Sequence, residues 1–404
     1  MSEKKPRILC QGHEISNDTR LTGMNNNDII IGPSGAGKSR GYVLPNILQC
    51  NENMVVADPK GVLYHQTGGV LQQEGYQVYN IDFTDCANSW GYNPLSYIHH
   101  DEATDTYKAQ DIIRVAACLV PIESSEPFWD LAARMRLESL ISYVLDYLPE
   151  EEHNLTSVVR LFQSAKAGLL FQEVLEIAPG SFTADRYQMS CMSKQADRMD
   201  GSIQGILAER LSCCSFDGAR AMFCNPKQFN IPNLGQGKVA LFLTISDTDR
   251  SMDRLVNLFF TQAINVLCTT ADHSPGHRLP TPVRFYLDDF AANFTIPDFD
   301  KLTSVIRSRE ISVSVILQSL SQLEAIYGTA RAATILNNAD HLLYLGGTDV
   351  GTAQTISVKA NKPTNTILQM PLDKAWLFTR GENPQPVRKY DVQDHPKYQY
   401  VPQD

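Results

Sequence analysis

The nine cysteines in this chain of 404 residues include no Cys-x-x-Cys pair, the spacing that most often marks a zinc site. The cysteines are therefore interpreted as reduced, mostly buried thiols of a cytoplasmic protein. The adjacent Cys213 and Cys214 fit buried small apolar residues better than a redox pair. His99 and His100, followed by Asp101, are interpreted as a polar loop boundary rather than a metal site.

Long apolar runs are also missing. No segment reaches membrane-spanning length, and no charged-then-apolar leader opens the sequence. The chain as written is therefore expected to be soluble. There is no internal repeat, and the short run Asn25-Asn26-Asn27 is the only low-complexity segment that we find.

Positive charge is scarce, since 35 lysines and arginines face 45 aspartates and glutamates, for a net charge of -10. This balance argues against a surface that grips duplex nucleic acid over a broad area. Any nucleic-acid contact is expected in a local groove or pore. With 43% hydrophobic and 20% charged residues, the chain is typical of a globular protein large enough for two domains, or for one domain with an insertion.

What the sequence does contain is a phosphate-binding loop of the form Gly-x-x-x-x-Gly-Lys-Ser, which follows the apolar run 29–31. Glycines let successive backbone N–H groups point at phosphates, Lys38 can reach the outer phosphates, and the Ser39 hydroxyl can ligate Mg²⁺. The motif predicts binding of ATP or GTP. Its residues are Gly32, Pro33, Ser34, Gly35, Ala36, Gly37, Lys38 and Ser39.

A second apolar segment, 283–287, ends in Asp288 and Asp289. Asp288 is predicted to hold the metal, usually through water. Asp289 occupies the position at which many ATPases carry a glutamate that polarises the attacking water. Aspartate is shorter by one methylene, so slow or partner-dependent hydrolysis is an open alternative.

Three further polar positions lie near predicted strand ends. Gln318 follows the apolar run 311–317 and is predicted to sense the terminal phosphate or to orient water. Arg307 and Arg309, on a predicted helix before that run, are candidates for an arginine finger that acts across a subunit boundary. Asp58 and Lys60 follow the run 54–57 and could link the nucleotide state to neighbouring loops, or could simply form a turn.

The pattern of apolar runs predicts an α/β fold. Near-continuous apolar runs alternate with helical patterns, as in a mostly parallel sheet that is covered on both faces. Residues 101–223 instead show helical spacing throughout. We therefore predict a discontinuous nucleotide-binding domain, 1–100 and 224–404, that carries an all-α insertion, 101–223. The predicted strands are 29–31, 54–57, 77–81, 239–245, 283–287, 311–317 and 342–345, and the clearest helices are 109–119, 129–147, 155–164, 167–177 and 251–270.

Several short segments, in this order, resemble the type IV secretion coupling proteins, the TraG-type conjugation ATPases. The resemblance covers nearly the whole chain. Its segments are the phosphate loop, Leu44-Pro45-Asn46, residues 56–61, Asn93-Pro94-Leu95, Pro127-Phe128-Trp129, residues 287–291, residues 296–299, residues 306–310, residues 317–319, residues 378–382, Lys389-Tyr390-Asp391 and His395-Pro396.

This resemblance implies a RecA-like nucleotide-binding domain whose all-helical domain faces the substrate. It further implies a hexameric ring at the cytoplasmic face of the bacterial inner membrane. There, ATP would drive delivery of relaxase-bound single-stranded DNA, or of protein substrates, to a secretion channel. The implied partners are relaxosome proteins, the channel ATPases and inner-membrane components. By the same resemblance, Lys38 and Ser39 contact phosphate and magnesium, Asp288 holds the metal, Asp289 is the catalytic acid, Gln318 senses phosphate and Arg307 is the finger.

Two departures from the family pattern leave alternatives open. Relatives carry transmembrane helices ahead of the phosphate loop, where this sequence has a short polar segment, so the chain alone could stay monomeric. The usual Asp-Glu-Phe-Ala-Asn reads Asp-Asp-Phe-Ala-Ala-Asn over 288–293. A substrate-docking receptor with weak or no hydrolysis is therefore the second hypothesis, and a translocase that pumps duplex DNA is the third.

Overall fold

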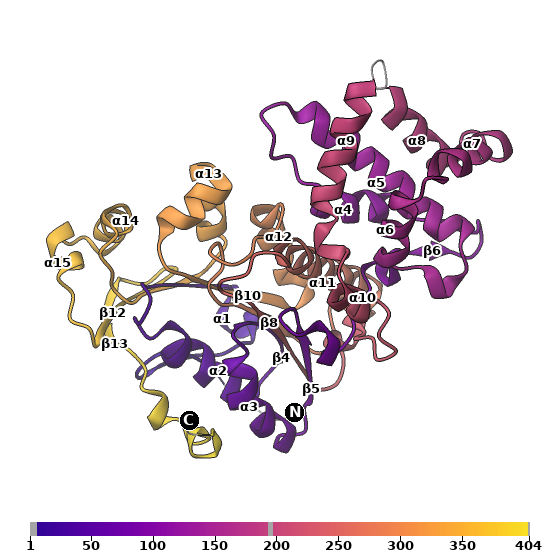
Figure 1. Ribbon diagram of the computed structural model, residues 1–404. Coiled ribbons are helices and arrows are strands. Elements are labelled where there is room, and N and C mark those ends of the chain that lie inside the picture. Colours follow the sequence, from indigo (N-terminus) through magenta and orange to yellow (C-terminus); the bar gives the residue numbers. More distant parts are fainter. Residues whose placement is uncertain (1–5, 193–196, 403–404) are drawn as a thin grey trace. The chain divides into compact units, whose positions relative to one another are not determined.

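The computed structural model describes residues 6–192 and 197–402. The chain divides into two compact units (Figure 1). The first, called here the α/β unit, comprises Met1–Thr84, Asn230–Thr248 and Ile264–Asp404. The second, called the helical unit, comprises Asp85–Phe229 and Asp249–Ala263.

The α/β unit is built on a sheet of nine strands in the order β13-β12-β11-β3-β10-β9-β4-β8-β5. All neighbours run parallel except β11 with β12 and β12 with β13. The strands are β3 (Asp28–Ile31), β4 (Asn53–Pro59), β5 (Gln77–Asp82), β8 (Val239–Ile245), β9 (Val283–Leu287), β10 (Ile311–Leu317), β11 (His341–Tyr344), β12 (Lys374–Thr379) and β13 (Gln385–Arg388).

Burial explains which strands the sequence predicts. Strands β3, β8, β9, β10 and β11 are buried at every residue, as expected for parallel strands covered on both faces. All seven predicted strands are present, with ends that shift by up to two residues. Strands β12 and β13, and the hairpin of β1 (Arg7–Cys10) and β2 (His13–Ile15), were not predicted, because they are short or only partly buried.

Helices and turns of the α/β unit connect these strands. The segment after the phosphate loop begins with a π-helical turn, η1 (Ser39–Val43), and continues as α2 (Leu44–Gln49). Residues from η1, α2, α3, several strands and the C-terminal segment form one apolar core. The remaining helices and turns of the α/β unit are α1 (Thr19–Thr22), α3 (Val62–Gln73), η6 (Ile231–Gly235), η7 (Pro275–His277), α12 (Phe299–Val305), η8 (Arg307–Arg309), α13 (Leu320–Asn337), α14 (Val350–Ala360), α15 (Thr364–Leu368), η9 (Val392–Asp394) and η10 (Tyr398–Tyr400).

A buried charge cluster joins several strands of the α/β unit at their amino-terminal parts. Arg284 of β9 is fully buried and pairs with Glu52 and with Asp28. Asp28, at the start of β3, also pairs with Arg7 of β1 at 2.7 Å. Because each buried charge faces an opposite charge, the cluster satisfies groups that could not be buried alone.

The helical unit is arranged around the 21-residue helix α5, which packs against α4, α6, α8 and α9 (Figure 1). The predicted helices 109–119, 129–147, 155–164 and 167–177 are all present. A two-residue hairpin, β6 (His100–Asp101) with β7 (Thr106–Tyr107), also lies here. The helices are α4 (Ala109–Leu119), α5 (Pro127–Tyr147), α6 (Leu155–Gln163), α7 (Ala167–Ile177), α8 (Phe182–Met192), α9 (Asp197–Arg210) and α10 (Asp217–Phe223), with short turns η2 (Cys86–Asn88), η3 (Pro94–Tyr97), η4 (Glu150–Glu152) and η5 (Ser212–Cys214).

The helical unit is larger than the predicted insertion, 101–223. It begins at Asp85, because the Tyr97 hydroxyl donates to the Phe229 carbonyl at 2.6 Å and the Asn93 amide donates to the His153 carbonyl at 2.7 Å. It also includes Asp249–Ala263, the first half of the helix α11 (Asp253–His273). These contacts join residues far apart in the sequence, so helical spacing alone does not reveal them.

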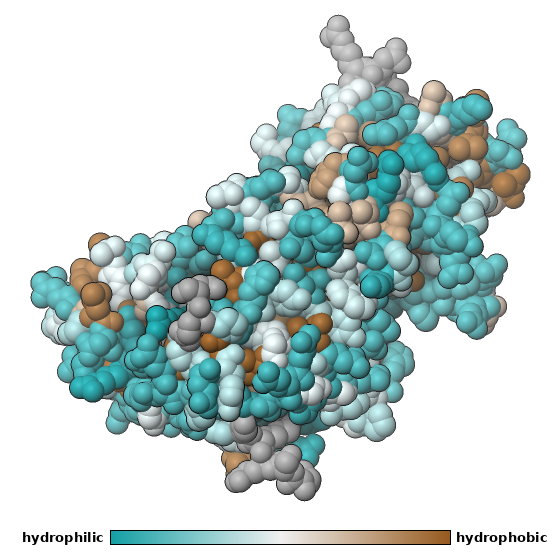
Figure 2. Space-filling model, turned by 60° about the horizontal axis from the view of Figure 1, so that its bottom comes forward, coloured by the Kyte–Doolittle hydropathy of each residue, from teal (hydrophilic) through white to brown (hydrophobic). Residues whose placement is uncertain are grey.

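The surface is mostly hydrophilic, as the net charge suggests, and Figure 2 shows apolar side chains gathered in small separate patches. The most exposed large apolar side chains include Leu169, Ile177, Val358 and Leu372. No helix among residues 6–192 and 197–402 has both the length and the apolar character needed to cross a membrane.

Candidate nucleotide-binding site

The phosphate loop leaves β3 at the carboxyl edge of the sheet. Gly32 N–H donates to the Leu317 carbonyl at the end of β10, at 3.0 Å. Gly35 and Gly37 adopt left-handed φ values of 76° and 89°, which glycine takes up without strain. A Cβ on Gly32 would lie 2.9 Å from that of Ala36. The loop therefore needs glycine at these positions to curl as the motif predicts.

Lys38 is nearly buried and its ammonium group remains at the loop. The Nζ donates to the carbonyls of Gly32 at 2.8 Å and Pro33 at 3.1 Å. It also lies 3.9 Å from Oδ1 of Asp289. The two carbonyls hold the Lys38 ammonium group at the loop, where charge-assisted bonds to an anion can form.

Ser39 and Asp288 lie in direct contact. The Ser39 hydroxyl donates to Oδ2 of Asp288 at 2.5 Å. Burial, together with the negative charge of Asp289, raises the pKa of Asp288 to about 6, although the bond from Ser39 and the charge of Lys38 oppose the shift. A hydroxyl and a carboxylate at one point are oxygen ligands of the kind Mg²⁺ takes. The residues therefore fit a magnesium ion.

Asp289 is held in an uncommon backbone conformation with φ of 51°. Its N–H donates to Oδ1 of Asp288 at 3.1 Å, and its carboxylate accepts from Nε2 of Gln318 at 3.5 Å. Left-handed φ at a residue other than glycine costs on the order of 1–2 kcal/mol. The strain and the two contacts fix the direction of this carboxylate beside Lys38.

A cleft of about 630 Å³ is lined in part by Ser39, Asp288 and Asp289, and its volume lies within the range of small-molecule sites. Asp58 lies in its wall and accepts from the N–H groups of Leu63 at 3.1 Å and Tyr64 at 2.7 Å, which caps α3. Burial raises the pKa of Asp58 to about 7. The cleft is lined by Ser34, Ser39, Arg40, Leu44, Asp58, Pro59, Lys60, Val62, Leu63, Gln66, Asp247, Asp288, Asp289, Asn293, Gln318 and Tyr398.

Lys60 lies at the rim of the cleft, also with positive φ, at 72°. Its Nζ pairs with Oδ2 of Asp247 at 2.8 Å. The loops after β4 and β8 are thereby joined beside the site. Both side chains are exposed, so the pair itself adds little stability.

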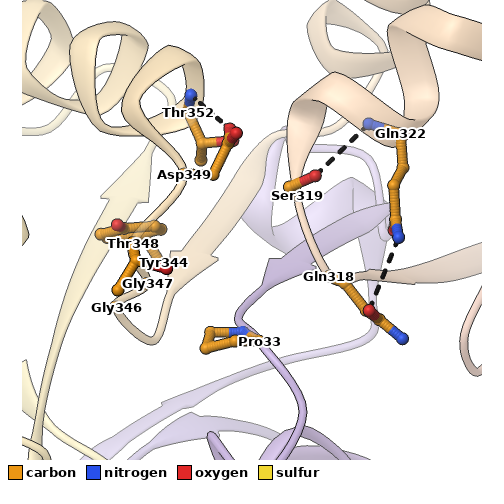
Figure 3. Close-up of a pocket in the computed structure, with 10 residues that line it drawn as sticks. All are labelled: Pro33, Gln318, Ser319, Gln322, Tyr344, Gly346, Gly347, Thr348, Asp349 and Thr352. Atoms are coloured by element: carbon orange, nitrogen blue, oxygen red, sulfur yellow. Dashed lines mark hydrogen bonds between the residues drawn. The ribbon is translucent and has the colours of Figure 1, made fainter.

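A second, smaller cavity of about 170 Å³ is also lined by Gln318 (Figure 3). Gln322 of α13 donates to Oε1 of Gln318 at 3.5 Å. Pro33 of the phosphate loop faces the segment that carries Gly346 and Gly347, and a Cβ on Gly347 would lie 3.4 Å from Pro33 Cδ. Gln318 thus separates the nucleotide cleft from a polar cavity bounded by α13 and α14.

Arg307 does not join this site within the chain. It lies in η8 ahead of β10, at the edge of the sheet opposite the phosphate loop, and its guanidinium donates to the Gly23 carbonyl at 3.3 Å. Arg309 makes two bonds to Asp272, at 2.8 and 3.0 Å. A finger role for Arg307 therefore requires a second subunit and stays a prediction.

The structure brings together Lys38, Ser39, Asp288, Asp289 and Gln318, which the sequence proposed as site residues. It adds Arg40, Gln66 and Tyr398, which the sequence reasoning missed. Arg40 follows the motif directly, so its position was available as a signal. No local pattern marks Tyr398, because it comes from a turn more than 350 residues further along the chain.

Comparison with known proteins identifies the family. A family model described as type IV secretory system conjugative DNA transfer matches residues 10–383. Among curated relatives, VirD4 of Rhizobium radiobacter is 24% identical over 343 residues, which cover 81% of this chain and 47% of that protein. VirD4 of Agrobacterium fabrum is 23% identical over 345 residues, covering 81% of this chain and 48% of its own length. The chain spans about half the length of the curated relatives it matches.

Solved structures show the fold. The plasmid coupling protein TrwB in complex with the ATP analogue ADPNP has a TM-score of 0.71 at 17% identity, covering 96% of this chain and 90% of TrwB. TrwB in complex with ADP and Mg²⁺ has a TM-score of 0.70 at 17% identity, with the same coverage. VirB4 of Thermoanaerobacter pseudethanolicus has a TM-score of 0.57 at 12% identity, covering 99% of both chains. The predicted α/β fold with a RecA-like phosphate-loop domain is confirmed. Since the family model matches most of the sequence, the chain belongs to the type IV secretory system conjugative DNA transfer family, the coupling proteins of type IV secretion.

Proposed function

We propose that this chain is an ATP-hydrolysing coupling protein that delivers relaxase-bound single-stranded DNA, protein substrates, or both to a type IV secretion channel. One observation carries the enzymatic part of the proposal. Lys38, Ser39 and Asp288 converge at the carboxyl edge of the sheet, with Ser39 and Asp288 2.5 Å apart. This is the arrangement that phosphate-loop NTPases use for the triphosphate and its metal. TrwB, which has the same fold, has been solved with ADPNP, GDPNP and ADP with Mg²⁺.

Each residue has a task that follows from its position. The N–H groups around Gly35 and Gly37, with Lys38, bind phosphate oxygens. Ser39 and the ionised Asp288 hold Mg²⁺, which when bound neutralises phosphate charge. Asp289 lies next to Lys38 and Gln318, so it can accept a proton from water while Gln318 keeps its carboxylate oriented.

The proposed assembly of this chain is a homo-hexamer. A hexamer at the cytoplasmic face of the inner membrane would bring Arg307 of one subunit toward the nucleotide of the next. It would also enclose a pore in which an acidic protein can grip a single strand locally, mainly through backbone charge and base stacking. Relaxosome proteins, channel ATPases and inner-membrane components are the proposed partners, as in the family.

The proposal is tested with Lys38→Ala, assayed for ATP hydrolysis with and without single-stranded DNA. We expect the wild-type chain to hydrolyse ATP with Mg²⁺, single-stranded DNA to stimulate it, and Lys38→Ala to lose turnover by at least a hundredfold. Lys301→Ala serves as the matched control, because Lys301 is not among the residues that line the cleft and pairs with an exposed carboxylate, that of Asp298. An unchanged rate in Lys38→Ala would contradict the motor assignment.

One observation favours the second candidate, a docking receptor with weak hydrolysis. The catalytic position carries the shorter Asp289, which already contacts Lys38 and Gln318 in this structure. Nucleotide binding that depends on Lys38, together with turnover that DNA does not stimulate, would support the receptor and reject the motor.

A further inference from the structure

The C-terminal segment reaches the nucleotide cleft. After β13, the chain runs back toward α2 and α3, where Figure 1 shows it in yellow. Val392 and Val401 of this segment are buried in the same core as Tyr42 and Leu63. Lys397 pairs with Glu74, the residue after α3, at 2.7 Å. The segment is therefore fixed to the α/β unit at several points.

Two contacts attach this segment to the phosphate loop itself. Lys389 Nζ donates to the carbonyl of Ala36 at 2.9 Å, and burial lowers the pKa of Lys389. The Tyr390 carbonyl approaches η1 so closely that a Cβ on Gly41 would lie 3.2 Å from it. The position of the segment is thus set against the residues that curl around the phosphates.

The lining of the cleft includes one connected cluster of polar side chains, called here the polar end. Its members Ser39, Asp288, Asp289 and Gln318 contact one another in a chain. The rest of the lining is mixed, with the apolar side chains of Leu44, Val62 and Leu63, with Gln66 and Tyr398, and with the charged Arg40, Asp58, Lys60 and Asp247. A triphosphate and its metal account for the polar end alone. Among the described residues that line the cleft, Tyr398 is the only aromatic one.

We infer that Tyr398 forms the wall against which the purine base of the bound nucleotide packs, and that the C-terminal segment thereby completes the nucleotide site. This inference depends on the proposed function, since it requires nucleotide at the phosphate loop. An aromatic ring offers a base a flat apolar face of matching size. Tyr398 is half-buried at the core edge, which limits the motion of its ring before a ligand arrives. The Gln66 amide can donate to or accept from ring atoms of the base.

The test compares two probes, Mg-ATP and Mg-tripolyphosphate, by calorimetric titration of the full chain. Tripolyphosphate carries the phosphates without the base, so it senses the polar end alone. We expect Tyr398→Ala to weaken ATP binding about tenfold and to leave tripolyphosphate binding unchanged. Tyr398→Phe should bind both probes as the wild-type chain does, because stacking needs the ring and not the hydroxyl. Tyr400→Ala is the matched control, since Tyr400 lies in the same turn with 59% of its surface exposed.

The outcomes separate this inference from the proposed function. The inference alone is contradicted if Tyr398→Ala binds ATP as tightly as the wild-type chain, or if it loses affinity for both probes equally. In either case, loss of ATP binding in Lys38→Ala shows that the proposed nucleotide site still stands. A wild-type chain that binds neither probe contradicts the proposed function as well. A thermal melt of Tyr398→Ala by circular dichroism within a few degrees of the wild-type melt shows that a selective loss of ATP binding is not a loss of folding.

Discussion

At the scale of single residues, Asp288 links metal binding to pH. Its pKa, raised to about 6 by burial, lies above the usual value, so the folded protein holds this proton more tightly than the unfolded chain does. Without metal, the contribution of Asp288 to stability is therefore most favourable below about pH 4. It declines as pH rises through 6. Metal binding has the opposite trend, because the ligand must be ionised.

We expect Mg²⁺-dependent ADP affinity to fall about tenfold per pH unit below pH 6, the slope for loss of one ionised ligand. Asp289→Asn should shift this midpoint to lower pH, because the negative charge of Asp289 raises the pKa of Asp288. Titrations with ADP at fixed Mg²⁺ from pH 5 to 8 measure the ADP affinity of the wild-type chain and of Asp289→Asn. Protonation of the ADP phosphates affects both proteins equally, so it cancels in the ratio of the two affinities. A midpoint that stays in place, or moves up, would contradict the assignment.

The sequence was sufficient to propose the polar end of the cleft at residue resolution. Lys38 and Ser39 belong to a motif whose spacing fixes their roles, and Asp288 follows a strand that the apolar run 283–287 makes evident. Tyr398 could not be proposed, because its place in the cleft depends on Lys389 and Val401 packing against residues far away in the sequence. Nor could Asp289's left-handed backbone be foreseen from an Asp-Asp pair.

At the scale of elements, one carboxylate joins two helices beside the cavity of Figure 3. Oδ2 of Asp349 accepts from the N–H of Thr352 at 2.8 Å, which caps α14, and from the Ser321 hydroxyl of α13 at 2.9 Å. The Thr352 hydroxyl in turn accepts from the N–H of Leu320 at 2.9 Å. The Thr352 hydroxyl also donates to Oδ2 of Asp349, at 2.5 Å, and this bond, with those from the Thr352 N–H and from Ser321, holds the pKa of Asp349 below its usual value.

Asp349→Ala should lower the free energy of unfolding by about 1–2 kcal/mol, since it removes an N-cap and a bond between helices. Urea unfolding followed by circular dichroism measures the change. Glu324→Ala on α13 is the control, because Glu324 is exposed, and a surface substitution of this kind changes stability by less than about 0.5 kcal/mol. Equal effects from the two substitutions would show that the cap contributes nothing.

Helices were predicted well where apolar residues recur at helical spacing and less well where a local turn sets the end of an element. The helices 109–119 and 167–177 coincide with α4 and α7, since their apolar residues recur at helical spacing. Arg307 and Arg309 are predicted on a helix, and they lie in η8, a single 3-10 helical turn that ends where Glu310 adopts a left-handed φ of 61°. Helix propensity alone does not determine where η8 ends, because the strand β10 begins directly after Glu310.

At the scale of the whole molecule, the predicted site residues that converge all belong to the α/β unit. A ligand that binds only the folded form of one unit stabilises that unit, by about 2.7 kcal/mol at a hundredfold excess over its dissociation constant. The two units should therefore respond differently to nucleotide.

We expect Mg-ATP to slow amide hydrogen exchange at the phosphate loop and at the ends of β9 and β10, and to leave α4, α6 and α7 unchanged. Mass spectrometry of peptides from the full chain, with and without nucleotide, measures this. Lys38→Ala should remove the effect. Slower exchange confined to α4, α6 and α7 would place the nucleotide outside the α/β unit and contradict the site.

The extent of the units was the part of the architecture that the sequence revealed least. Helical spacing marks where helices lie, but Asp249–Ala263 joins the helical unit through contacts such as that of Tyr92 with Gln262, whose side chains are 2.5 Å apart. Contacts across 170 residues of sequence leave no periodic trace. The boundary at 85 has the same origin, in the bond from Tyr97 to Phe229.

The anchor between Lys389 and Ala36 has a practical consequence for anyone who shortens this protein. The family match ends at residue 383. A gene trimmed at that point would stop before β13 and would lose Lys389, the buried Val392 and Val401, and Tyr398. Such a product would retain every residue of the recognised motif and still lack one side of its nucleotide cleft. Poor nucleotide affinity in a trimmed version would then reflect the cut and not the full chain.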